Sequence, residues 1–83
     1  MELNETTKIK LDCGKETEVH EIIAHVYNAL KLKGYDPISQ LVGYILSDDP
    51  TYITSHDGAR GMIVRVERDE LLEEIVKSYL KNL

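Results

Sequence analysis

The clearest pattern of apolar residues lies between Glu16 and Lys33, where large aliphatic side chains recur every three or four positions. This spacing places them within an arc of about 100° around a helix axis, the width of a stripe that faces a hydrophobic core. The stripe consists of Val19, Ile22, Ile23, Val26 and Leu30. Glutamates stand near its start, lysines stand near its end, and Gly34 follows as a candidate C-terminal cap. The sequence therefore predicts a helix over residues 16–33.

A second apolar stripe predicts a helix over residues 37–47. Asp36 followed by Pro37 is typical of a helix start, because the carboxylate caps exposed N–H groups and proline has no N–H that would need a partner there. The stripe consists of Ile38, Leu41, Val42, Ile45 and Leu46. Asp48-Asp49-Pro50 then indicates a stop and a restart. Residues 50–54 form either a single helical turn or an extended link.

Two shorter segments complete the predicted helical domain. The third stripe consists of Ala59, Met62, Ile63 and Val66. Either Ser55 or Asp57 can cap this third helix. The last helix is predicted to start at Asp69 and to run to Lys81, with its glutamates early and its lysines late.

The last predicted helix is apolar over about 180° of its circumference, which is wider than one packed face requires. The residues concerned are Leu71, Leu72, Ile75, Val76, Tyr79 and Leu80. A second contact surface explains this width, and the interface of a homodimer is the simplest candidate. A chain of this size also gains little more from burial than it loses in conformational entropy, which favours a partner surface.

Residues 1–15 carry no helical stripe and are interpreted as a flexible N-terminal arm. Polar and apolar residues alternate from Thr7 to Leu11, which would also suit a short edge strand. The predicted organisation is therefore an all-α, compact four-helix domain over residues 16–83, preceded by the arm over residues 1–15. A fifth helical turn at 50–54 is the alternative to a link.

Composition narrows the classes of function. The 83 residues carry a formal net charge of −5 and give a pI of about 5.1, which disfavours nucleic acid as the main partner. No apolar run approaches the roughly 18 residues that a membrane span needs, so we expect no membrane insertion. Cys13 is the only cysteine, so no internal disulfide can form and a reducing, cytoplasmic location is expected.

Two groups of polar residues have the composition of chemical sites but not the spacing. His20 and His25 are five positions apart, which separates them by about 140° on a helix and prevents joint metal binding. The consecutive Ser-His-Asp at 55–57 cannot align as a hydrolytic triad. It is interpreted as a helix start that caps itself or, with Arg60, holds an anion. A small enzyme that uses His56, Asp57 and Arg60 is a further alternative, but we predict no catalytic residue, metal or cofactor.

Tyrosine supplies all five aromatic residues of the chain. A tyrosine ring buries well while its hydroxyl stays hydrated, which suits interfaces and the rims of clefts. Half-buried edges of a small core are the alternative interpretation. The candidates for a dimer interface or cleft are Tyr35, Tyr44, Tyr52, His56, Arg60 and Tyr79.

A nucleic-acid-binding module is the main alternative function. Arg60, Arg65 and Arg68 lie within nine positions of one another. On a helix, however, Arg60 and Arg65 would be about 140° apart and would not form one basic face. Together with the acidic net charge, this makes nucleic acid an unlikely partner.

Three strings of the sequence are more specific than any of these patterns. They are GYDPISQLVGYILS at 34–47, DPTYITSH at 49–56, and the segment from ERDELLEE at 67–74 to Tyr79-Leu80. These strings resemble the IreB-like family of small bacterial regulatory proteins, and the similarity extends without gaps over residues 5–83.

The resemblance implies a cytoplasmic, homodimeric, helical regulator with a cleft at the subunit interface, and not an enzyme. It implies phosphorylation by a membrane-bound Ser/Thr kinase that senses cell-wall stress, a cognate phosphatase, an unknown downstream protein, and negative regulation of cephalosporin resistance. The string Glu5-Thr6-Thr7-Lys8-Ile9 matches the family's phosphorylated segment, which places the phosphothreonine at Thr6. Thr7 stands where the family usually has an apolar residue and is the second candidate. Leu3 occupies the place of the family's other acceptor, so the same double phosphorylation is not expected.

Overall fold

The computed structural model describes residues 18–83, and within this range every regular element is helical. The first helix occupies residues 18–32 of the described chain. It is followed by α2 (Pro37–Ser47), the short 3₁₀ helices η1 (Pro50–Tyr52) and η2 (His56–Gly58), α3 (Ala59–Ile63) and α4 (Arg68–Lys81). The predicted all-α fold with four helices is confirmed, and the alternative helical turn at 50–54 is present as η1. The predicted arm and the edge strand from Thr7 to Leu11 lie outside the described residues.

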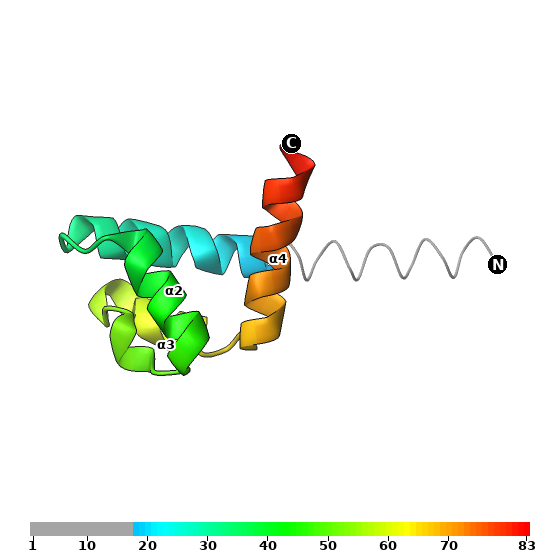
Figure 1. The fold of residues 1–83 in the computed structure, drawn as a ribbon. Coiled ribbons are helices and arrows are strands. Elements are labelled where there is room, and N and C mark those ends of the chain that lie inside the picture. Colours follow the sequence, from blue (N-terminus) through cyan, green and yellow to red (C-terminus); the bar gives the residue numbers. More distant parts are fainter. Residues whose placement is uncertain (1–17) are drawn as a thin grey trace.

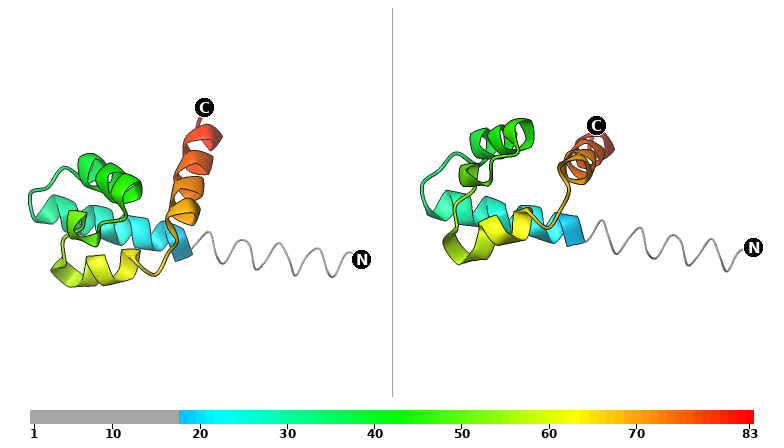
Figure 2. Two further views of the ribbon diagram at one scale, coloured as in Figure 1. Left: turned by 60° about the horizontal axis from the view of Figure 1, so that its bottom comes forward. Right: turned by 90° about the horizontal axis from the view of Figure 1, so that it is seen from below.

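The first helix lies in the middle of the molecule (Figures 1 and 2). Helix α2 lies on one side of it, and η2 with α3 lies on the other. Helix α4 crosses the first helix near the N-terminal end of that helix, on the same side as α2, and its second half projects beyond the other elements. Two helices thus share one side of the central helix but point in different directions.

The core is built around the predicted stripe of the first helix. Val19, Ile22, Val26 and Leu30 are buried, and Ile23 packs half-buried against them. The remaining buried residues are Ala29, Tyr44, Ile53, Ala59, Ile63, Val66 and Leu71. The third predicted stripe is also confirmed, because three of its members are buried and Met62 packs against the same cluster.

Two predicted helix ends are confirmed by their hydrogen bonds. Gly34 adopts a left-handed φ of +86°, and the Tyr35 N–H donates to the Leu30 carbonyl over 2.9 Å. Such a turn closes the end of a helix and favours glycine, which has no Cβ to strain. At the start of α2, the Asp36 carboxylate accepts hydrogen bonds from the Ile38 N–H and the Ser39 hydroxyl.

Two other predicted helix starts were wrong. Helix α4 begins at Arg68, one residue before Asp69, and the preceding Glu67 makes no side-chain cap. Helix α3 follows Gly58, and neither this residue nor Ser55 before η2 provides a side-chain capping bond. Asp57 instead adopts a left-handed φ of 56° inside η2. The chain makes a kink there, so short-range capping patterns did not locate the true start.

Candidate functional site

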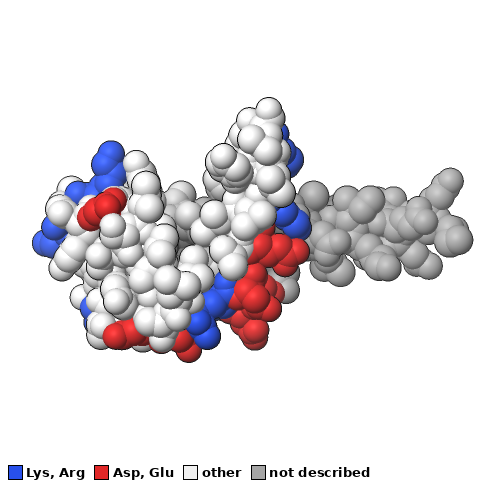
Figure 3. Space-filling view, viewed as in Figure 1, with Lys and Arg blue, Asp and Glu red and all other residues white. Residues whose placement is uncertain are grey.

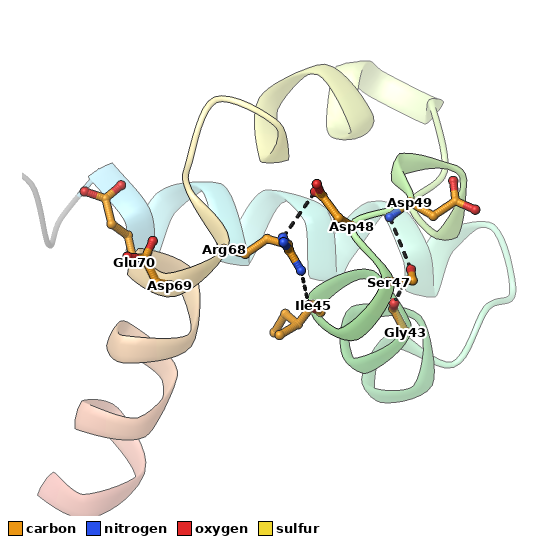
Figure 4. A network of polar contacts seen from close by, with 8 residues as sticks. All are labelled: Gly43, Ile45, Ser47, Asp48, Asp49, Arg68, Asp69 and Glu70. Atoms are coloured by element: carbon orange, nitrogen blue, oxygen red, sulfur yellow. Dashed lines mark hydrogen bonds and ion pairs between the residues drawn. The ribbon is translucent and has the colours of Figure 1, made fainter.

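A polar junction joins the end of α2 to the start of α4 (Figure 4). The Arg68 Nη1 atom donates to the Ile45 carbonyl over 2.8 Å, and its Nε atom lies 3.2 Å from Asp48 Oδ1. The last carbonyls of a helix have no partner within the helix, so Arg68 satisfies one of them. Asp48 adopts a left-handed φ of 58°, and its own N–H donates to the Tyr44 carbonyl. One arginine therefore links the start of α4 to the end of α2.

A pocket with a volume of about 420 Å³ lies beside this junction. Its lining includes Tyr44, Asp48, Val66 and Arg68. Burial raises the pKa of the Tyr44 hydroxyl above its ordinary value, the carboxylate of Asp48 raises it further, and the positive charge of Arg68 opposes both effects. Because Tyr44 therefore stays protonated at neutral pH, the pocket offers a hydroxyl and an already paired arginine, not a reactive anion.

The turn after α2 is fixed by local side chains. The Ser47 hydroxyl donates to the Gly43 carbonyl, and the Asp49 N–H donates to the Ser47 oxygen. Asp49 then accepts hydrogen bonds from the hydroxyl and the N–H of Thr51, which hold the pKa of its carboxyl below the ordinary value. These hydrogen bonds favour the charged carboxylate and therefore stabilise the turn at neutral pH. Their contribution is lost as the pH falls through the lowered pKa of Asp49.

The six residues predicted for a dimer interface or cleft come from several different elements of the chain. Tyr44 is buried at the polar junction, whereas Tyr35 lies in the turn before α2 and Tyr79 lies in the projecting half of α4. Tyr52 covers Gly43, where an added Cβ would clash with the ring. The two remaining candidates, His56 and Arg60, belong to η2 and α3.

The other polar residues singled out from the sequence have structural contacts. Arg60 Nε donates to the Ile53 carbonyl over 2.8 Å, as Arg68 does to Ile45, so two of the three clustered arginines bind backbone oxygens. His25 Nε2 donates to the Asp57 carbonyl over 2.8 Å and lies 3.7 Å from its carboxylate. This contact joins segments 32 positions apart, and no short sequence pattern predicts it.

Helix α4 has a packed apolar side and an exposed apolar side, which are neighbours on the helix. On the inner side, Leu71 is fully buried and Ile75 is half-buried. On the outer side, Leu72, Val76 and Leu80 are exposed along one line with Asp69, Glu73 and Lys77 beside them. The wide stripe read from the sequence is therefore one packed side plus one uncovered side, and we call the latter the outer face of α4.

Helix α2 also leaves large apolar side chains uncovered. Ile38 is 73% exposed, Val42 48% and Leu46 78%, and their spacing of four places them on one face. The expected core stripe of this helix was therefore wrong in part, because only Leu41 and Ile45 pack against the core. The side of the molecule that carries α2 and the upper part of α4 is largely uncharged, and acidic residues gather at the base of α4 (Figure 3).

Among residues 18–83 no group of three or more His, Cys, Asp or Glu side chains could hold a metal ion. The helices within that range include none that is long and apolar enough to cross a membrane. The described residues present uncovered helix faces and a structural polar junction.

Comparison with known proteins identifies the family. The sequence model of the family described as IreB regulatory phosphoprotein matches residues 4–81. The chain is 58% identical over 82 residues to a UPF0297 protein of Ruminiclostridium cellulolyticum, covering 99% of this chain and 93% of that one. It is 57% identical over 81 residues to a UPF0297 protein of Acetivibrio thermocellus, covering 98% and 90%. The chain belongs to the IreB regulatory phosphoprotein family, which supports a regulatory role.

Proposed function

We propose that this protein is a non-enzymatic, cytoplasmic regulator that a membrane-bound Ser/Thr kinase phosphorylates on Thr6. The observation that carries the proposal is the family match over residues 4–81, which includes the string Glu5-Thr6-Thr7-Lys8-Ile9. In this function the kinase transfers the γ-phosphoryl group of ATP to the Thr6 hydroxyl, and a cognate phosphatase removes it by hydrolysis. The regulated process is signalling of cell-wall stress or resistance to beta-lactams, and the effector is a downstream protein.

The match of this segment to the family's phosphorylated segment supports Thr6 as the acceptor. Thr6 and the residues beside it lie outside the described residues 18–83, ahead of the helical core. A phosphate would add about −1.5 to −2 charges to a chain whose formal charge is −5. Thr7 is the neighbouring hydroxyl and therefore the natural comparison. The proposal assigns no catalytic residue, metal or cofactor.

Phosphate mapping tests this assignment. The full chain is incubated with the catalytic domain of a Ser/Thr kinase of this signalling class and ATP, and the modified residue is located by tandem mass spectrometry. We expect one phosphate on Thr6, complete loss of it in Thr6→Ala, and normal modification in the matched variant Thr7→Ala. Phosphate found only beyond residue 15 would reject the assignment.

We further propose that two copies associate through the outer face of α4. This face is supported by exposed Leu72, Val76 and Leu80 and by the order of charges along the helix. Acidic residues occupy the first half of α4, and Lys77 and Lys81 occupy the second. An antiparallel pair of α4 helices centred near Val76 would bring the acidic half of one copy against the basic half of the other. Apolar contact and charge complementarity would then act together.

A further inference from the structure

A second groove lies between α4 and the first helix, on the packed side of α4. The inner sides of Ile75, Tyr79 and Leu83 meet His20 and Ile23 of the first helix there, and the groove has a volume of about 590 Å³. Tyr79 is 68% exposed and Leu83 is 87% exposed, so this part of α4 is uncovered on its inner side as well. Figure 1 shows why: the second half of α4 extends past the first helix and has no other described helix opposite it. We call this groove the inner corner.

The start of the first helix borders the inner corner. His20 lines the groove and lies two residues after Glu18, the first residue of the first helix that the structure describes. Seventeen residues precede that point. The seven steps from Leu11 to Glu18 span up to about 24 Å, whereas the rise of α4 from Ile75 to Lys81 is about 9 Å. A segment that ends at Leu11 can therefore reach any part of the groove.

The character of residues 7–11 complements the inner corner. Ile9 and Leu11 alternate with Lys8 and Lys10 in this segment. Except for His20 and Glu74, the groove is lined by apolar and uncharged side chains. Apolar side chains from the segment would cover the exposed side of α4, and its lysines would lie near the carboxylate of Glu74.

We propose that residues 7–11 of the same chain dock in the inner corner. We propose in addition, resting on the phosphorylation proposed above, that a phosphate on Thr6 releases them. The segment carries two positive charges, and a phosphate of about −1.5 to −2 on the adjacent residue cancels them and is repelled by Glu74. Release would uncover the inner side of α4, which gives the modification a physical effect on the helical domain.

Nuclear magnetic resonance on the full, unphosphorylated chain tests the docking. The double variant Ile9→Ser, Leu11→Ser is compared with the natural sequence by amide chemical shifts. We expect the amides of Ile23, Ile75 and Tyr79 to shift in the double variant while the amides of α2 stay in place. The matched control is Leu3→Ser, which removes an apolar residue outside the segment and should leave all of these amides unchanged.

Identical spectra of the inner corner in the natural chain and the double variant would overturn the docking proposal. Equal shifts in Leu3→Ser would also overturn it, because the effect would then not belong to residues 7–11. Because no kinase is used, this experiment is independent of whether Thr6 is the phosphorylated residue.

The release is tested on chain phosphorylated in vitro and confirmed by mass to carry phosphate on Thr6. We expect the inner-corner amides to move to the positions seen in the double variant. Unchanged amides in the phosphorylated chain would overturn the release while leaving the docking result in place. A chain that docks but is never modified on Thr6 would contradict the proposed function and not the docking.

Discussion

Helices α2 and α4 each bury only one residue, yet they are held in the molecule in different ways. Helix α2 contains no charged residue and buries Tyr44. The Tyr52 ring covers it at Gly43. Its Gln40 side chain also donates to the Tyr52 carbonyl. Helix α4 has seven charged residues among 14, buries Leu71, and is joined to α2 through Arg68 at its first position. Helix α2 is thus held along its length, and α4 mainly near its start.

This difference shows that apolar content does not reveal which part of a helix is covered. Both stripes are wider than one packed face, and in both the excess lies on the surface. In α4 the charged residues beside Leu72, Val76 and Leu80 mark the edges of the uncovered face. Helix α2 has no charged residues, so its sequence does not mark where the packed side ends and the exposed side begins.

The largest loss of stability is expected from a substitution on the packed side of α4. Leu71→Ala removes the one fully buried side chain of this helix and should lower the free energy of unfolding by about 2–5 kcal/mol. The adjacent Leu72→Ala, on the exposed side, should change it by less than about 1 kcal/mol in dilute, monomeric protein. Chemical denaturation followed by circular dichroism measures both. Equal losses in the two variants would mean that α4 is held from both sides.

Matched substitutions on the exposed faces of α2 and α4 show which of the two faces forms the dimer interface. Val42 in α2 and Val76 in α4 are matched, with 48% and 45% of their surface exposed. Val76→Asp should raise the dimer dissociation constant on the order of 100-fold, because a carboxylate would be buried without a partner. Val42→Asp should leave it unchanged within about twofold. Sedimentation equilibrium measures both, and dissociation by Val42→Asp alone would move the interface to α2.

A third substitution tests the contact between the Tyr52 ring and Gly43 of α2. Gly43→Ala places a methyl group against the Tyr52 ring, which must move, and should cost about 1–3 kcal/mol of stability. Gly61→Ala is the matched control, because nothing lies within 4 Å of its added Cβ, and it should stabilise α3 by about 0.5–1 kcal/mol. Thermal unfolding distinguishes the two. A stabilised Gly43→Ala variant would show that Tyr52 does not pack there.

Several parts of the fold follow from short stretches of sequence. The stripe of the first helix, the glycine turn at Gly34 and the Asp36-Pro37 start were predicted because each depends on residues within one or two turns. The kink at Asp57 and the first residue of α4 were not, because neighbouring segments decide among several capping residues of similar strength. Thr6 was identified by resemblance alone, since no physical pattern distinguishes it from Thr7.

The candidate site was less predictable than the helices. Tyr44 was expected at an interface or cleft, and it is the buried residue of α2 beside Arg68. Arg68 was considered only as part of a basic cluster, whereas its guanidinium binds the Ile45 carbonyl and Asp48. The two partners lie about twenty positions before it in the chain, and such contacts leave no periodic signal.

The amino-acid sequence by itself determined the number and approximate limits of the helices, the residues of the first helix that face the core, and the family. These properties depend on periodicity, local capping and shared strings, all of which can be read along the chain. Only the tertiary structure decided which side of α2 and α4 is covered, and that α4 leaves both an outer face and an inner corner open. The physical reason is that burial depends on which other elements lie opposite a residue, and their positions are set by contacts between distant segments.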